Sequence, residues 1–203
     1  SDSFTFTVSD DGDPSLSDTE TVTLTVNAIN DAPVLETVLD VTFDEDGSSD
    51  VIVLSSTDVD DGDSATYSIT EGTDITATLN GSDVSFSAPL DYNGSENFTI
   101  TVEDSGELTD SQIITVTVNA VNDDPVAQAD ISGIGDEDQS ISVLLSGSDV
   151  DGDVLSYSIT SNPVSGTIEI LGANATYTPG ANFNGSDSFT FTVSDDGDPS
   201  LSD

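Results

Sequence analysis

The 203 residues include no Lys, Arg, His, Cys, Met or Trp. Nucleic acids and anionic lipid surfaces are bound through Lys and Arg, so we expect neither as a partner, and no side-chain ion pair can form within the chain. The imidazole, thiol and amine groups that serve as most general bases and activated nucleophiles are also missing, and we therefore predict no enzymatic activity. Without Cys there are no disulfides, which leaves the cellular compartment open.

Long apolar runs are absent as well. No segment approaches the roughly 20 apolar residues that a membrane helix needs, so we expect no direct membrane insertion. Residue 1 falls within a strand-like pattern rather than a leader, and we expect no targeting signal in this segment.

The chain has an excess of acidic residues, because 41 Asp and Glu residues give a formal net charge of −41. A folded body with this charge repels itself, which predicts bound cations.

The sequence repeats itself at two scales. Residues 1–18 are identical to residues 186–203, a step of 185 residues. Within that step, Asn30 and Asp31 recur as Asn122 and Asp123, 92 residues later. The repeating unit is therefore about half of the longer step. We expect the last two strands of one repeat at 1–31, one complete repeat at 32–123, and a repeat without its last strand at 124–203.

The complete repeat carries the two-residue period of β-strands. Phe98, Ile100 and Val102 alternate with Thr, which places one face of a strand in a core and the other in water. The same alternation recurs at 114–118, and shorter β-branched runs predict strands at 38–43, 51–55, 66–70, 75–79 and 84–87. About seven short strands without a helical stretch predict an all-β fold of tandem, immunoglobulin-like antiparallel β-sandwiches.

The carboxylates gather where the predicted strands end. Residues 58–63 and 149–153 contain the pattern Asp-x-Asp followed by Gly-Asp, in loops that no helix flanks, so an EF-hand is not expected. Calcium takes six to eight oxygen ligands from flexible loops of this kind. The alternative is a plain solvated turn, since Asp and Gly also fill ordinary turns. The uncompensated charge favours Ca²⁺ as the bound cation.

The motifs at 58–63, 65–69, 90–92, 98–104, 116–118 and 121–125, in this order and spacing, resemble those of a cadherin repeat. The chain looks most like the bacterial cadherin-like tandem repeats that form the extender regions of large calcium-dependent (RTX-type) secreted adhesins, and the likeness covers its whole length. In that family calcium lies between successive domains and stiffens the array. The resemblance implies an extracellular or cell-surface spacer whose partners are adjacent repeats of the same chain.

The resemblance also implies two sets of metal ligands. At the junction of the second and third repeats these are Glu45, Asp91, Asn122, Asp123, Asp149, Asp151, Asp153 and Asp195. At the earlier junction they are Asn30, Asp31, Asp58, Asp60, Asp63 and Asp104, and Glu137 is the counterpart of Glu45 in the third repeat. For Glu45 and Glu137 a solvated strand-end turn is a competing interpretation. Ala28 and Ala120 stand where a cadherin linker has its first Asp, which argues against three ions per junction.

Three other functions are alternatives to the spacer, and the first of them, an enzyme, is the one that we do not expect. A glycosidase would pair Asp91 with Glu96, but the chain has no Trp to form a sugar platform. A sugar- or ice-binding module would use the outward rows of Thr and Ser. A self-assembling filament would use the segment that begins at Thr19 and ends at Asn27, which has the sequence of the strand missing from the third repeat. That segment could complete the open sheet edge of another copy of the chain by strand complementation.

Overall fold

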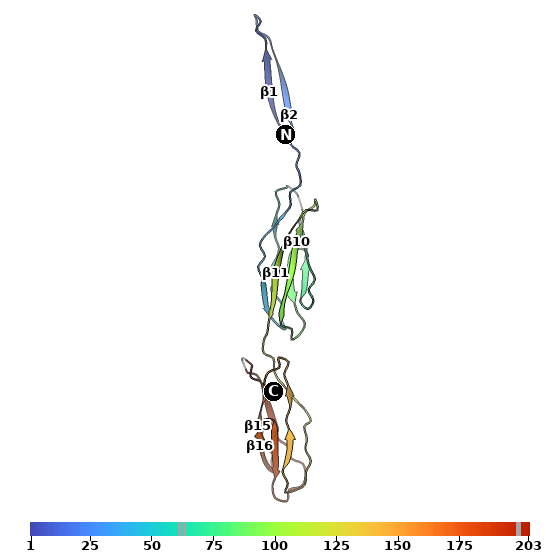
Figure 1. The fold of residues 1–203 in the computed structure, drawn as a ribbon, viewed down its shortest axis with the longest axis vertical. Helices are drawn as coiled ribbons and strands as arrows, with labels where there is room; N and C mark the ends of the chain where they lie inside the picture. Colours follow the sequence, from blue (N-terminus) through green and yellow to red (C-terminus); the bar gives the residue numbers. More distant parts are fainter. Residues whose placement is uncertain (61, 63, 198–199) are drawn as a thin grey trace.

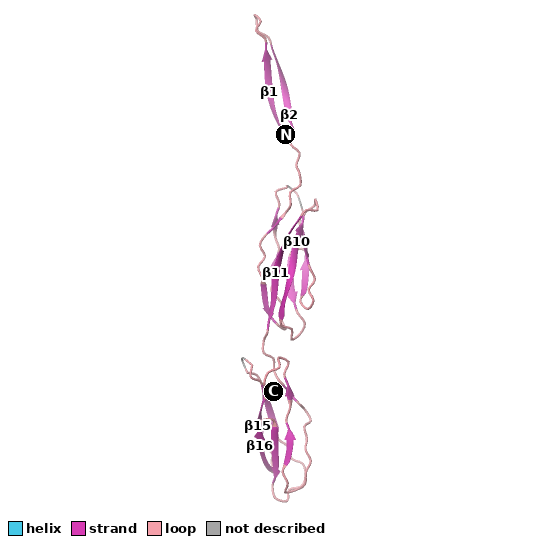
Figure 2. Cartoon of the chain, viewed as in Figure 1, coloured by secondary structure: helices cyan, strands magenta, loops and turns pink. Residues whose placement is uncertain are grey.

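The computed structural model describes residues 1–60, 62, 64–197 and 200–203. These residues form 18 strands, and none of them is helical. Figure 1 shows an elongated molecule in which a hairpin and two sandwiches follow one another in chain order. The strands of both sandwiches run roughly along the long axis, and loops lie at their ends and along their sides (Figure 2). The predicted all-β fold is confirmed, and the described residues include no helix that could cross a membrane.

The first unit is an isolated hairpin, which we call the N-terminal hairpin. Strand β1 (Asp2–Ser9) pairs with β2 (Ser17–Leu24) along their full length, and the two form a separate two-stranded sheet. Its apolar side chains remain largely exposed, including Leu24 at 54%.

The middle sandwich comprises nine short strands instead of the predicted seven. They are β3 (Val34–Leu35), β4 (Val41–Asp44), β5 (Ile52–Val53), β6 (Ser56–Thr57), β7 (Thr66–Ile69), β8 (Thr76–Asn80), β9 (Asp83–Ser87), β10 (Gly94–Glu103) and β11 (Thr109–Asn119). One sheet has the order β4-β11-β10-β7, another has the order β5-β9-β8, and β3 pairs with β6. Most pairs are antiparallel, but β4 lies parallel to β11. The strand expected at 38–43 begins at Val41 because its pairing with β11 begins there.

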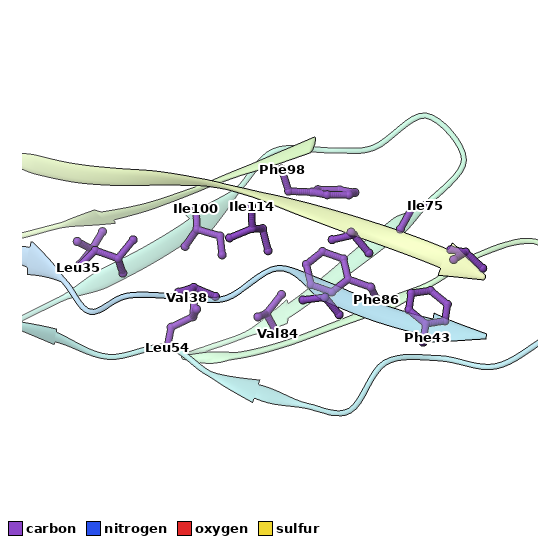
Figure 3. Close-up of a cluster of buried hydrophobic side chains, with 14 residues drawn as sticks. Leu35, Val38, Phe43, Leu54, Ile75, Val84, Phe86, Phe98, Ile100 and Ile114 are labelled. Atoms are coloured by element: carbon purple, nitrogen blue, oxygen red, sulfur yellow. The ribbon is translucent and has the colours of Figure 1, made fainter. Parts of the chain in front are cut away.

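Alternating side chains of the two sheets meet in a single apolar core. The inward residues of β10 and β11 are almost fully buried, and Figure 3 shows them packed between the two layers. Phe86 of β9 and Phe98 of β10 meet edge to face across the sheets, with ring centroids 5.1 Å apart. This two-residue alternation is what the sequence predicts for both strands. The core holds the strand ends, and therefore the acidic loops, in fixed positions.

The C-terminal sandwich repeats this plan with fewer strands. They are β12 (Val126–Ala127), β13 (Ile141–Leu144), β14 (Gly147–Ser148), β15 (Ser156–Ser161), β16 (Gly166–Leu171), β17 (Asn174–Pro179) and β18 (Thr190–Ser194). In the described part of the chain, β4 and β11 have no counterpart strands here. Strand β18 corresponds to β10 but has five residues instead of ten. We attribute the shortening to the lack of a β11-like neighbour.

Candidate metal centre

In each sandwich a segment that follows a short strand, 58–60 after β6 and 149–151 after β14, turns around one Asp carboxylate. Oδ1 of Asp58 accepts a hydrogen bond from the backbone N–H of Asp60 at 2.8 Å, and Oδ1 of Asp149 accepts one from Asp151 at 2.9 Å. Such Asx turns arise because a short carboxylate can bond the backbone two residues further on. The remaining oxygen of both carboxylates, Oδ2, is buried without a hydrogen-bond partner.

The linker before each sandwich contacts these loops in the same way. The Asn122 amide donates to Oδ2 of Asp195 at 3.0 Å, and the Asp123 N–H donates to Oδ2 of Asp151 at 2.8 Å.

At the earlier junction, Asn30 donates to Oδ2 of Asp104 at 2.9 Å and the Asp31 N–H donates to Oδ2 of Asp60 at 2.8 Å. The repeated Asn-Asp pair therefore attaches each linker to the sandwich that follows it.

Asp195 is buried and joins two parts of the junction. Its Oδ1 accepts the N–H groups of Gly197 at 3.1 Å and Leu201 at 2.9 Å, while its Oδ2 accepts from Asn122. Burial raises the pKa of Asp195, but these hydrogen bonds outweigh burial and the pKa lies below its ordinary value. A Cβ at Gly197 would overlap the Asn122 side chain, which would then have to shift away from Asp195.

Asp104 has the same arrangement at the earlier junction. Its Oδ1 accepts from the N–H groups of Gly106 at 2.8 Å and Leu108 at 2.9 Å. Burial raises its pKa, and the hydrogen bonds from Leu108, Asn30 and Gly106 together lower it further than burial raises it. Both buried Asp residues therefore stay ionised and hold their hairpin loops against the linker.

The preceding sandwich supplies the other side of the second junction. Glu45 follows β4, is only 5% exposed, and accepts the Val121 N–H through Oε1 at 2.6 Å. Asp46 and Asp91 both have left-handed backbone conformations, with φ of 62° and 56°. They are held together because the Asp91 N–H donates to Oδ1 of Asp46 at 3.0 Å. Residues 44–46 therefore form the strand-end turn that was the competing interpretation, but Glu45 is buried in it and not solvated.

Two groups of carboxylates converge on Asp123. Glu45, Asp123 and Asp151 each offer an oxygen within 4.8 Å of the others, and so do Asp46, Asp91 and Asp123. Asp46 was not among the ligands expected from the sequence. Its position directly after Glu45 in an acidic turn was the available signal.

The surroundings of Asp123 disfavour its negative charge. Its pKa is raised by burial first, and then by the nearby carboxylates of Asp91, Asp46, Asp151 and Glu45. Its Oδ2 is buried without a hydrogen-bond partner, like the Oδ2 atoms of the two loop carboxylates. Buried carboxylate oxygens without donors are costly unless they are paired with a cation. An oxygen-ligated divalent cation fits these residues.

Asp153 is half-buried beside the same junction. Burial raises its pKa, and the carboxylates of Asp149, Asp196, Asp151 and Asp195 raise it further. Its N–H also reaches Oδ1 of Asp149, at 3.4 Å. The second junction thus brings together all eight residues expected there, which are Glu45, Asp91, Asn122, Asp123, Asp149, Asp151, Asp153 and Asp195.

The remaining expected ligands are less complete as a group. The earlier junction brings together five of the six residues expected there, which are Asn30, Asp31, Asp58, Asp60 and Asp104. The sixth, Asp63, lies outside the described residues. Glu137 is exposed in the C-terminal sandwich, next to Asp138, whose Oδ1 accepts the Asn182 N–H at 2.8 Å. This pair corresponds to Asp46 and Asp91, so Glu137 occupies the place of Glu45 with no linker beside it among the described residues.

Glu96 has a local structural role that accounts for its carboxylate. Its oxygens accept the N–H groups of Thr73 and Asp74 at 2.8 Å each, and that of Ile75 at 3.4 Å. The bond from Asp74 is the largest cause that lowers the pKa of Glu96. The pairing of Glu96 with Asp91 as an acid and a nucleophile therefore has no support from this geometry, because Asp91 belongs to the junction.

Comparison with known proteins identifies the architecture. The family described as Bacterial Ig domain matches residues 30–117 and 122–200. Mouse cadherin-23 EC22-24 is similar in structure, with a TM-score of 0.59 at 20% identity, covering 98% of this chain and 71% of that one. Protocadherin Gamma B2 domains 1-5 give a TM-score of 0.55 at 19% identity, covering all of this chain and 43% of that one, so the chain spans less than half of it. No curated protein matches the chain at a significant level.

Proposed function

Because the chain belongs to the bacterial Ig domain family, we propose that it is a calcium-rigidified extracellular spacer of a large bacterial adhesin or surface filament. Domains of this family are typically structural modules exposed outside the cell. In this proposal consecutive repeats, with boundaries near residues 31 and 123, hold a distal adhesive region away from the cell. The function of the chain then lies in its length and stiffness.

One observation carries the proposal. At the second junction the linker residue Asp123 lies among carboxylates from both sandwiches, and its Oδ2 is buried with no donor. Without a cation, mutual repulsion between these groups would push the two sandwiches apart. With a divalent cation the same groups would draw both sandwiches onto the linker. The junction therefore has the residues of a joint that a cation stiffens.

The ligand chemistry favours calcium over other metals. The described site offers carboxylate oxygens together with an Asn side chain, and the sequence contains no His or Cys. Calcium accepts many oxygen ligands in irregular geometry, whereas Mg²⁺ demands near-ideal octahedral geometry and Zn²⁺ prefers nitrogen and sulfur. Glu45, Asp91, Asp123 and Asp151 would hold the ion, with Asp46 as an added ligand. When bound, calcium would supply the positive charge that the chain lacks.

The protein's own residues then determine the direction of the joint. The bonds from Asn122 to Asp195 and from Asp123 to Asp151 hold the linker on the following sandwich, and the bond from Val121 to Glu45 holds it on the preceding one. An ion in contact with both sides would remove the remaining rotation about a short linker. Extracellular millimolar calcium would keep modest sites filled, because binding to the folded state alone stabilises it by mass action.

The test is thermal unfolding combined with small-angle scattering, in chelator, in about 1 mM calcium and in about 1 mM magnesium, a range that extracellular modules bind. We expect calcium to raise the melting temperature, because it offsets the repulsion at the junction, and to give a longer and straighter average particle, because an ion in contact with both sides removes rotation about the linker. Magnesium is the matched control and should do much less. Equal curves in all three solutions would refute the calcium-stiffened spacer.

A further inference from the structure

The linker between the middle and C-terminal sandwiches, residues 120–125, is attached to them unequally. Asn122 and Asp123 bond to the C-terminal sandwich, whereas Val121 bonds to the middle sandwich. We propose that the bond from Asn122 to Asp195 docks this linker onto the C-terminal sandwich without any cation. Asn122 is then a positioning residue that places Asp123 for the cation.

This bond, the Asn122–Asp195 clamp, is built from protein groups alone. Asp195 is only 5% exposed, and its Oδ1 accepts the N–H groups of Gly197 at 3.1 Å and Leu201 at 2.9 Å from its own hairpin loop. Its Oδ2 accepts the Asn122 amide at 3.0 Å. Hydrogen bonds to a charged group are roughly twice as strong as neutral ones. In this proposal the two residues hold the linker and are not ligands, because both oxygens of Asp195 already have donors.

The clamp fixes the residue at which the carboxylates meet. Asp123 follows Asn122 directly, and its N–H donates to Oδ2 of Asp151 at 2.8 Å. The Asp151 N–H donates in turn to Oδ1 of Asp149 at 2.9 Å, so the loop that receives the linker is itself held. Two residues after Asp123, Pro125 is fully buried. One half of the cation site therefore exists before an ion binds.

The face toward the middle sandwich is held against repulsion. The Val121 N–H donates to Oε1 of Glu45 at 2.6 Å. The carboxylates of Glu45, Asp46 and Asp91 lie close to that of Asp123, and charges of the same sign repel one another. In the calcium-stiffened spacer, on which this inference rests, the ion offsets that repulsion. Without an ion this face should open while the clamp stays closed.

The two attachments confine rotation to a short segment. The carbonyl of Asn119 accepts the Glu45 N–H at 3.0 Å, so Asn119 belongs to the middle sandwich. Asn122 belongs to the C-terminal sandwich through the clamp. Ala120 and Val121 lie between them, and both are exposed. We therefore expect the cation-free joint to turn about these two residues and not along the whole linker.

The same clamp occurs at the earlier junction. Asn30 donates to Oδ2 of Asp104 at 2.9 Å, and Oδ1 of Asp104 accepts N–H groups of the loop that follows it. A Cβ at Gly106 would overlap Asn30, as one at Gly197 would overlap Asn122. Recurrence at both junctions indicates that each repeat carries the linker before it as part of its own fold.

Amide hydrogen exchange, followed by NMR on the full chain in chelator and in about 1 mM calcium, tests the proposal. We expect the Asp123 N–H to be protected in both solutions and the Val121 N–H to be protected only in calcium. Asn122→Ala should reduce the protection of the Asp123 N–H in chelator roughly 10- to 100-fold, as expected for loss of a hydrogen bond to a charged group. Asn30→Ala is the matched control, because it removes the same clamp at the earlier junction and should leave Asp123 unchanged.

A reciprocal replacement separates positioning from general destabilisation. Asn122→Asp sets two carboxylates against each other and should reduce the protection of the Asp123 N–H. Adding Asp195→Asn again places one donor against one acceptor at the original net charge, and should restore the protection. An Asp123 N–H that exchanges freely in chelator, or that Asn122→Ala does not affect, would overturn the clamp. Equal protection of Val121 in both solutions would instead count against the calcium-stiffened spacer, while a protected Asp123 would still support the clamp, so the two failures are distinguishable.

Discussion

The replacement Asp123→Asn should have opposite effects on stability with and without calcium. In chelator it removes a charge that burial and four neighbouring carboxylates disfavour, so the melting temperature should rise above that of the original chain. In calcium the same change removes a charged ligand from both carboxylate groups, because Asp123 is the residue they share. The melting temperature should then fall below that of the original chain.

The size of the calcium-dependent effect follows from the composition of the groups. Each group retains two of its three carboxylates after the replacement. Because calcium affinity depends on the number of charged ligands, we expect the dissociation constant at each group to rise about tenfold. For a saturating ligand, a tenfold loss of affinity lowers the melting temperature of a domain of this size by about 5–10 °C. The two groups together should give roughly twice that change.

Differential scanning calorimetry in chelator and in calcium measures both signs, and calorimetric titration measures the affinity. The control is Asp124→Asn, which removes the same charge from an exposed neighbour outside both groups. It should change the melting temperature little in either solution. A change of the same sign in both solutions, or equal effects of the two replacements, would refute the assignment of Asp123 as a shared ligand.

Three further changes test other parts of the structure. Phe98→Ala should destabilise the middle sandwich by about 3–5 kcal/mol in a denaturant titration, because the ring is fully buried, and a cost below about 1 kcal/mol would contradict the described core. Glu96→Gln should cost about 1 kcal/mol at neutral pH. The pKa of Glu96 in the folded state lies below its ordinary 4.5, so the difference in unfolding free energy between the two chains should be constant above pH 4.5 and vanish as the pH falls through the folded-state value. A difference that grows on acidification would be inconsistent with this role. Gly197→Ala should displace Asn122 and bend or loosen the second junction in a scattering measurement. Gly172→Ala has open space around its Cβ but a φ of 60° that strains an Ala locally, so it is a control for the shape change and not for stability.

Several features could be predicted from residues that lie close together in the sequence. The alternation at 98–102 identified the inward and outward faces of β10, because side chains of a strand alternate by geometry. The repeated Asn-Asp pairs and Asp-rich loops predicted where acidic side chains gather, and the structure brings Asp123 and Asp151 together at the second junction. The net charge of −41 by itself implied that the folded chain needs cations. These inferences need no knowledge of which distant segments meet.

Other features were decided only by the tertiary structure, because they join residues far apart in the chain. Val121 bonds to Glu45 across 76 positions, and Asp91 bonds to Asp46 across 45. The sequence therefore could not distinguish Asp46 from the acidic residues beside it, because only the folded chain, with left-handed backbone at both residues, places it next to Asp91. The parallel pairing of β4 with β11 decided where β4 begins. Local sequence determines residue chemistry and strand faces, whereas the convergence of carboxylates depends on which strands pair.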